Sequence, residues 1–288
     1  MANEGSNKIA DKAGILYLVA TPIGNLEDIT FRAVRILGEV DFVAAEDTRL
    51  GRKLLSHLGI SKPIFSYYAQ NERSRGPLII ERLAAGETAA LISDAGTPGL
   101  SDPGEDLVRL AVAAGIRVIA LPGANALLTA LTVSGICSKS FIFEGFLPRR
   151  KGERQKYLRQ LAPESRTLIF YEAPHRLAAV LLDMMEIFGN NRPAVICREL
   201  TKYYEEIRRD SLEALAAYYS ENQPKGEFTL VVAGLQAQEP ETKPNKSELT
   251  DALLELLEQG LGRKEAARQI ADRFEISAQE VYRLGSRE

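Results

Sequence analysis

The sequence predicts an α/β protein with two α/β domains, a mainly parallel sheet in the first and a mixed sheet in the second, followed by a small helical segment. Three observations predict this fold class. Short apolar runs alternate with helix-forming stretches between residues 15 and 134, which is typical of parallel strands joined by right-handed crossovers. Beyond residue 139 strands follow one another without an intervening helix, which indicates partly antiparallel pairing. A polar, proline-interrupted stretch at 236–246 then precedes three short helical patterns.

These changes of pattern suggest domain boundaries. We expect a flexible tail over residues 1–13, an amino-terminal α/β domain over 14–135, a second α/β domain over 136–236, a linker over 237–247 and a helical segment over 248–288. The last segment resembles a helix-turn-helix, and a plain dimerising or packing appendage is the alternative.

In the first half, each apolar run ends at a turn rich in Gly, Pro or polar residues. The expected strands are Ile15–Ala20, Phe42–Ala45, Ile64–Tyr67, Thr88–Ser93 and Arg117–Leu121. The expected helices are Thr30–Glu39, one that follows Arg49 and ends at Leu58, Gly76–Ala85, Glu105–Ala114 and Ala124–Ser134. Thr30 is expected to cap its helix, and Gly59 and Gly115 are expected to follow the ends of theirs.

In the second half, the expected strands are Phe141–Phe146, Thr167–Tyr171, Ala194–Arg198, Tyr203–Arg209 and Gly226–Ala233. Helices are expected up to Ile187 and over Leu212–Tyr219, and in the tail over Leu249–Leu257, Lys264–Phe274 and Ala278–Leu284. Ser277 with Glu280 three residues later has the spacing of a capping box for the last helix.

Composition narrows the class of protein. Of 288 residues, 45% are hydrophobic and 26% charged, as in an ordinary globular protein. The net charge of −3 gives no general nucleic-acid signature, so any RNA contact must come from a local patch. Cys137 and Cys197 stand in apolar settings, which predicts buried thiols and a cytoplasmic location. No apolar run is long enough to predict a membrane span.

Several common chemistries are excluded by missing motifs. The chain has no Gly-x-x-x-x-Gly-Lys-Ser/Thr phosphate loop, no Gly-x-Gly-x-x-Gly after a strand and no Gly-x-Ser-x-Gly elbow. Its two histidines, His57 and His175, have no zinc-type spacing with cysteine, so we expect no metal. His57 is expected to lie at a helix end, where a cation is favoured.

Two strand ends in the first half are candidates for a small-molecule site. The strand ending at Ser93 continues into a turn of small residues with one carboxylate, Asp94, and the strand ending at Leu121 leads to a helix start at Asn125. Ligands of open α/β sheets bind at such carboxyl ends, and a free helix N-terminus offers N–H donors. The alternative for Asp94 is an Asx-turn residue that only shapes its loop.

Five motifs carry a specific resemblance. In chain order they are Thr-Pro-Ile-Gly-Asn-Leu-Glu-Asp at 21–28, Ala-Glu-Asp-Thr-Arg at 45–49, Ser-Asp-Ala-Gly-Thr-Pro-Gly at 93–99, Pro-Gly-Ala-Asn-Ala at 122–126 and Tyr-Glu-Ala-Pro-His-Arg at 171–176. Together they resemble the tetrapyrrole methylase superfamily of class III S-adenosylmethionine-dependent methyltransferases. Within it they are most similar to the ribosomal RNA small subunit methyltransferase I family, over about residues 15–235.

The resemblance implies an activity and its partners. It implies 2′-O-methylation of a cytidine ribose in the decoding region of 16S ribosomal RNA, with S-adenosyl-L-methionine bound in a cleft between the two α/β domains. It also implies a homodimer that acts on the small ribosomal subunit. Two rivals stay open: a methylase acting on a tetrapyrrole or other small molecule, and a non-catalytic RNA-binding or assembly protein.

The resemblance also implies a set of cofactor-binding residues from both domains. The superfamily often has Gly-Asp-Pro around Asp94, from which Ser93 and Ala95 depart. The implied residues are Thr21, Pro22, Asp94, Thr97, Asn125, Ala126, Tyr171, Glu172 and Gly226.

A base or acceptor is needed for the proton of a ribose hydroxyl, which is a poor nucleophile. Glu46 and Asp47 end a strand at the ligand-facing edge of the sheet, with Arg49 beside them, so we expect this group to serve catalysis. The alternative is that Asp47 only caps the next helix and Glu46 pairs with Arg49.

One basic run is the candidate RNA contact. Arg149, Arg150, Lys151 and Arg154 follow directly after a strand end at the expected cleft, where cations can bind phosphates. The alternative is an exposed charged loop without a partner.

Overall fold

The computed structural model describes residues 14–222, 225–235, 246–274 and 276–284. The chain forms two compact units, Met1–Leu235 and Gln236–Glu288. The expected tail 1–13 and all but the end of the expected linker 237–247 lie outside the described residues.

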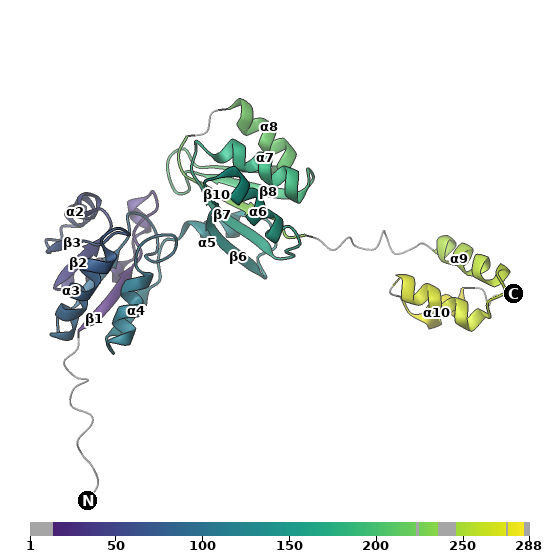
Figure 1. Cartoon of the computed structure of the whole chain (residues 1–288), viewed down its shortest axis with the longest axis horizontal. Helices are drawn as coiled ribbons and strands as arrows, with labels where there is room; N and C mark the ends of the chain where they lie inside the picture. The colour runs from purple at the N-terminus through teal and green to yellow at the C-terminus, as the bar shows by residue number, and fades with distance from the viewer. Residues whose placement is uncertain (1–13, 223–224, 236–245, 275, 285–288) are drawn as a thin grey trace, which may run out of the picture. The chain divides into compact units, whose positions relative to one another are not determined.

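The first sheet is entirely parallel, as the alternation of strands and helices predicts (Figure 1). Its strand order is β3-β2-β4-β1-β5. The connection after β1 runs toward one edge of the sheet and the connection after β4 toward the other, so the winding direction reverses between these two neighbours. The strands are β1 (Ile15–Val19), β2 (Phe42–Ala45), β3 (Ile64–Ser66), β4 (Ala89–Ile92) and β5 (Arg117–Leu121). A reversal of strand order opens a crevice at the carboxyl ends of the strands.

Helices cover both faces of this sheet, which explains why β2 and β4 are apolar at every position. Alternate side chains of β2 go to opposite cores: Phe42 and Ala44 pack toward α3 (Glu72–Ala84) and α4 (Glu105–Ala113). Val43 and Ala45 pack toward α1 (Phe31–Glu39) and α2 (Thr48–His57). The sheet is therefore a buried middle layer.

Local signals define several helix ends as expected. Thr30 caps α1 by accepting a hydrogen bond from Ala33 N at 3.1 Å. Gly59 follows α2 at φ +69° and His57 lies in the last turn of that helix. The helix α3 begins at Glu72, four residues before the expected Gly76, because its polar first turn has no apolar periodicity to reveal it.

The second sheet is mixed, which confirms the expected fold class. Its order is β6-β7-β10-β8-β9, with β6 parallel to β7 and the other neighbours antiparallel. The strands are β6 (Phe141–Phe146), β7 (Thr167–Glu172), β8 (Pro193–Arg198), β9 (Glu206–Ser211) and β10 (Phe228–Val232). Strand β9 begins at Glu206 rather than Tyr203, because the preceding residues form a tight turn with Thr201 at φ +65°.

Helices also cover both faces of the second sheet (Figure 1). One face packs against α6 (Lys151–Leu161), α7 (Leu177–Phe188) and α8 (Leu212–Glu221). The other packs against α5 (Ala126–Ser134), whose Leu127, Ala130 and Leu131 join one core with residues of β7, β8 and β10. The expected boundary after residue 135 stays a proposal, and the packing of α5 favours a boundary nearer its start.

The carboxyl-terminal unit contains the three expected helices, α9 (Lys246–Glu258), α10 (Arg263–Phe274) and α11 (Ala278–Arg283). They enclose a small core that includes Leu253, Ile270 and Val281. Ser277 is the N-cap of α11, but its side chain makes no capping hydrogen bond, so the capping box is not formed. The likeness to a helix-turn-helix stays a prediction.

The two cysteines differ from the expectation of buried thiols. Cys197 is buried in β8 at 1% exposure, whereas Cys137 is exposed. Cys137 lies in the connection between α5 and β6, and its apolar sequence neighbours do not cover it. Within the described residues, no helix is long and apolar enough to cross a membrane.

Candidate functional site

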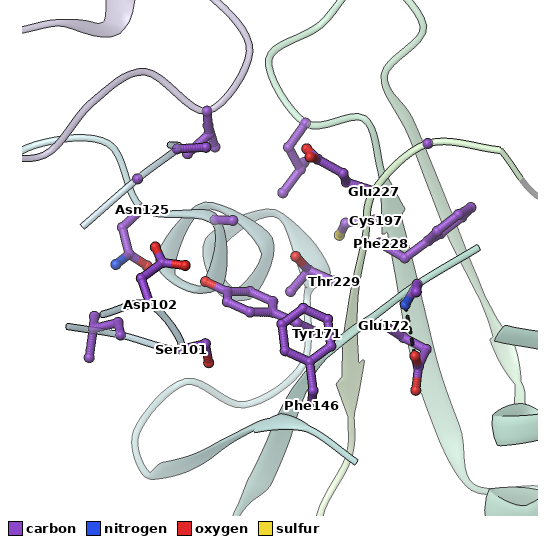
Figure 2. Close-up of a pocket in the computed structure, with 18 of the residues that line it drawn as sticks. Ser101, Asp102, Asn125, Phe146, Tyr171, Glu172, Cys197, Glu227, Phe228 and Thr229 are labelled. Atoms are coloured by element: carbon purple, nitrogen blue, oxygen red, sulfur yellow. Dashed lines mark hydrogen bonds between the residues drawn. The ribbon is translucent and has the colours of Figure 1, made fainter. Parts of the chain in front are cut away.

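A cavity of about 310 Å³ lies between the strand ends of the first sheet and the second sheet (Figure 2). From the first half, its wall includes Ile23, residues 95–97 and 100–102, and the start of α5. From the second half come the ends of β6, β7 and β8 and the segment that enters β10, with Phe146, Tyr171, Glu172, Ala173, Pro174, Cys197, Leu200, Gly226, Glu227, Phe228 and Thr229. The two halves therefore share one site.

The start of α5 is fixed by a short chain of hydrogen bonds. Asn125 is the N-cap, and its Oδ1 accepts from Leu128 N at 3.2 Å. Its Nδ2 donates to Thr97 Oγ1 at 3.1 Å, and Thr97 Oγ1 donates to Ala124 O at 3.2 Å. Thr97, Asn125 and Ala126 all line the cavity, where the sequence predicts them to be.

Three other predicted residues, Thr21, Pro22 and Asp94, are not among the residues that line the cavity. Thr21 is 2% exposed, its backbone pairs with Gly96 in both directions, and its Oγ1 donates to Ser93 O at 3.1 Å. Asp94 Oδ1 accepts from Asp47 N at 2.9 Å, which joins the loops after β2 and β4. The lining residues include neither of these two nor Pro22, so contact of all three with a cofactor stays a proposal, and the hydrogen bonds of Thr21 and Asp94 show that both support the turn.

Aromatic rings form much of the second wall. The Tyr171 ring lies edge-on to Phe143 and Phe146, with centroid distances of 4.9 and 5.8 Å. Figure 2 shows Tyr171 and Phe146 projecting into the cavity. Burial raises the pKa of Tyr171 to about 12, so its hydroxyl stays protonated and can donate. Such a wall suits a planar heterocycle.

Glu172 and Gly226 close the second wall at the ends of β7 and β10. The Glu172 side chain is fully buried, its Oε1 accepts from Ala173 N at 2.8 Å, and its Oε2 has no hydrogen-bond partner among the described residues. Burial raises the pKa of Glu172, although Arg176 Nε lies 3.3 Å from Oε1. Gly226 has φ +97°, and a Cβ there would lie 2.6 Å from the Glu199 side chain, so no larger residue fits.

The charged residues that line the cavity are all acidic. Three carboxylates line it, Asp102, Glu172 and Glu227, and its lining residues include no Lys, Arg or His. Burial raises the pKa of Asp102 to about 6, and the nearby Asp94 charge adds to that shift. A cationic ligand is favoured by such a wall. Asp102 is the site residue that the sequence analysis missed; the signal available was its Ser-Asp-Pro-Gly turn directly after the cavity turn.

The expected catalytic group is arranged differently from the prediction. Asp47 is the N-cap of α2, its Oδ1 accepts from Arg49 N at 2.8 Å, and its Oδ2 pairs with Arg49 Nη2 at 2.6 Å. Hydrogen bonds from Arg49 lower the pKa of Asp47 to about 2, which makes it a poor base. Arg49 therefore pairs with Asp47 and not with Glu46, whose pKa is raised by burial and by Asp102. The lining residues of the cavity include none of these three.

The basic run divides into exposed and buried members. Arg149, Arg150 and Lys151 are exposed at the start of α6. Arg154 is 5% exposed, its Nε donates to Asp183 Oδ2 at 2.7 Å, and it also donates to Arg149 O. Because its guanidinium is used inside the fold, Arg154 is withdrawn from the predicted RNA-contacting residues.

Sequence comparisons give several close relatives. A family model described as Tetrapyrrole (Corrin/Porphyrin) Methylases matches residues 15–216. A Synechocystis sp. protein named Ribosomal RNA small subunit methyltransferase I is 50% identical over 273 residues, 94% of this chain and 97% of that protein. Proteins of the same name from Halalkalibacterium halodurans and Bacillus subtilis are 47% and 46% identical, and cover 99% and 93% of this chain and 99% and 93% of their own lengths.

Solved structures agree in fold. A uroporphyrin-III C-methyl transferase from Thermus thermophilus, complexed with S-adenosyl homocysteine, aligns with a TM-score of 0.56 at 20% identity, over 76% of this chain and 97% of that one. The methyltransferase CobJ aligns with a TM-score of 0.59 at 19% identity, over 77% of this chain and 95% of that one. Both alignments place the two-sheet arrangement in a known fold.

Proposed function

We propose that this chain methylates ribosomal RNA of the small subunit, since it belongs to the tetrapyrrole methylase family and, within it, to the ribosomal RNA small subunit methyltransferase I family. Its cofactor is S-adenosylmethionine, which a relative's complex with S-adenosyl homocysteine supports. The reaction that we assign is methyl transfer to the 2′-hydroxyl of a cytidine ribose in the decoding region of 16S ribosomal RNA.

The observation that carries this proposal is the cavity, which has aromatic rings and three carboxylates but no cationic lining residue. Bound S-adenosylmethionine supplies an electrophilic methyl group on a positively charged sulfur. The carboxylates of the wall favour that charge, and Tyr171 and Phe146 offer faces and edges for the adenine ring. The free N–H groups at the start of α5 suit acceptors of the ligand.

The RNA enters this proposal through the exposed cations Arg149, Arg150 and Lys151. They follow β6, whose last residue Phe146 lines the cavity, so a bound phosphate backbone would pass its opening. Charge reversal in the double variant Arg149→Glu, Arg150→Glu should weaken binding to 16S ribosomal RNA and flatten its salt dependence. An equal reversal at Arg32 and Arg35, on α1, is the matched control.

A labelled-methyl transfer assay tests the proposed function. The substrates are purified 30S subunits and naked 16S ribosomal RNA, and the modified nucleotide is mapped by its resistance to alkaline cleavage. We expect one 2′-O-methylated cytidine. Label on a base, or no label on either substrate, would contradict the proposal. We also propose a cytoplasmic homodimer, which sedimentation and cell fractionation test.

One alternative has specific support, because the fold neighbours include uroporphyrin methyltransferases. A titration of the protein with a porphyrinoid distinguishes a tetrapyrrole substrate from RNA. Calorimetry with S-adenosylmethionine distinguishes an enzyme from a non-catalytic RNA-binding protein, which has no need of the cofactor.

A further inference from the structure

The turn that carries Asp102 packs closely against the rest of the fold at two places, between Ser101 and Gly145 and between Gly104 and Leu91. Ser101 has φ +63°, a conformation that residues other than glycine rarely adopt, and Gly104 has φ +144°. A Cβ on Gly145 would lie 2.8 Å from Ser101 Oγ, and one on Gly104 would lie 2.9 Å from the Leu91 side chain. Strained residues of this kind gather at functional sites.

The second sheet contacts this turn at Gly145, which lies close to Ser101. This glycine lies in β6 at φ +62°, at the point where the register with β7 shifts between Phe143 and Gly145. A bulge of this kind bends its strand and changes the direction of the side chains next to it. The glycine leaves room for Ser101, so the next residue, Asp102, is fixed at the cavity wall.

Asp102 differs from the other carboxylates of the cavity in its partners. Glu172 pairs with Arg176, and Glu227 pairs with Lys202 at 2.9 Å. Among the described ion pairs none involves Asp102. Among the three lining carboxylates it is the one without an ion pair to a described residue, so no cation opposes its taking up a proton.

The groups that face Asp102 are acidic or neutral. They are Glu46 at the end of β2, Asp94 and the Ser93 hydroxyl after β4, and Tyr171 of β7, toward which the Asp102 carboxylate points in Figure 2. Burial, with the charge of Asp94, raises the pKa of Asp102 to about 6, while the Ser93 hydrogen bond opposes the shift. A base with a pKa just below the working pH is ionised and still accepts a proton well.

We propose that Asp102 is the general base of the methyl transfer and accepts the proton of the ribose 2′-hydroxyl, an inference that rests on the proposed function. As the ribose oxygen forms its bond to the methyl carbon, the carbon–sulfur bond breaks and its electron pair neutralises the sulfonium. The hydroxyl proton moves to a carboxylate oxygen of Asp102 and then leaves to solvent. This assignment replaces Glu46 and Asp47 as the expected base.

The test compares the wild type with Asp102→Asn, Asp102→Glu and a control, Asp106→Asn. Asp106 is a partly exposed carboxylate four residues along the chain that pairs with Arg109 and does not line the cavity. For each protein we measure kcat on 30S subunits from pH 5 to 9, and the affinity for S-adenosyl homocysteine by calorimetry.

We expect Asp102→Asn to lower kcat about 10²–10⁴-fold, with less than about threefold change in cofactor-product affinity. The kcat of the wild type should rise with pH through an inflection near 6, and that inflection should vanish in Asp102→Asn. Asp102→Glu should recover part of the rate, and Asp106→Asn should match the wild type.

Three results would overturn the assignment. A kcat for Asp102→Asn within tenfold of the wild type, with the inflection retained, would overturn Asp102 alone. Loss of S-adenosyl homocysteine affinity in parallel with kcat would show that Asp102 holds the cofactor instead. A wild type that methylates no ribose would overturn the proposed function itself, and the role of Asp102 with it.

Discussion

The two walls of the cavity are built from different structural elements and different kinds of residue. The first wall is made of turns that follow parallel strands, and its contacts are backbone groups and short polar side chains such as Thr97 and Asn125. The second is made of large rings and buried charges on a mixed sheet, such as Tyr171 and Glu172. The first wall depends on local turn geometry, whereas the second depends on tertiary packing.

This difference predicts unequal responses to substitution. Substitutions in the half of the chain that forms the second wall should strongly lower the free energy of unfolding or the cofactor affinity. Substitutions in the first wall should have smaller effects on both, and some should change only one of the two.

The largest loss of stability is expected for Arg154→Ala, in α6 of the half of the chain that forms the second wall. Removing the guanidinium leaves the Asp183 carboxylate buried without its partner, so the free energy of unfolding should fall by about 3–5 kcal/mol. The matched control is Arg35→Ala, which removes an exposed pair with Glu39 and should lower stability by about 0–1 kcal/mol. Urea unfolding measures both. Similar values for the two variants would contradict the contrast between buried and exposed pairs.

The next effect concerns the aromatic wall. Tyr171→Ala should weaken S-adenosyl homocysteine binding roughly 10- to 100-fold, because stacking of a base on a ring contributes about 1–3 kcal/mol. Tyr68→Ala, a partly exposed ring that does not line the cavity, is the control and should bind like the wild type. Calorimetry gives both affinities. Equal binding by all three proteins would remove the ring from the cofactor site.

Asp102→Asn should stabilise the fold at neutral pH. The pKa of this carboxyl is raised in the folded state, from 3.8 to about 6, so the ionised form lowers stability as pH rises through that interval. Allowing for partial exposure, the variant should gain about 1–2 kcal/mol at pH 7. The gain should disappear below about pH 4, where the carboxyl is protonated in both states. Thermal unfolding at pH 4 and pH 7 measures it, and a gain of equal size at both values would contradict ionisation of Asp102 as its cause.

The smallest effect should separate capping from binding in the first wall. Asn125→Ala and Thr30→Ala each remove an N-cap hydrogen bond and should lower stability by about 1 kcal/mol. Only Asn125 also lines the cavity and bonds Thr97, so only its variant should lose cofactor affinity. Denaturation and calorimetry on the same samples make the comparison. If both variants bind alike, Asn125 acts only as a cap.

Much of the fold could be predicted from the sequence because its signals are local. The continuous apolar runs of β2 and β4 reflect burial on both faces, and Thr30 and Gly59 mark helix ends by their own chemistry. Six of the nine predicted cofactor residues line the cavity, namely Thr97, Asn125, Ala126, Tyr171, Glu172 and Gly226.

The remaining features depend on partners distant in the sequence. Arg154 looks like its exposed neighbours until α7 brings Asp183 against it, 29 residues away. Asp102 lies at the cavity wall in a turn whose Ser101 packs closely against the bulged Gly145 of β6, more than 40 residues along the chain. Asp94 stands in the sequence as a candidate ligand contact, and the structure adds that its Oδ1 accepts a hydrogen bond from Asp47 N in the loop after β2, 47 residues away. Such choices between partners cannot be read from spacing along the chain.

The packing of α5 against the second sheet has a mechanical consequence. The body of this helix packs against β7, β8 and β10, while its N-cap residue, Asn125, is bonded to Thr97 on the opposite half. Any opening that admits or releases a ligand must therefore break that tie or drag the turn along with it. The exchange rate of the Leu128 amide hydrogen, bonded to the Asn125 side chain, should thus rise with those openings that break the tie by turning that side chain.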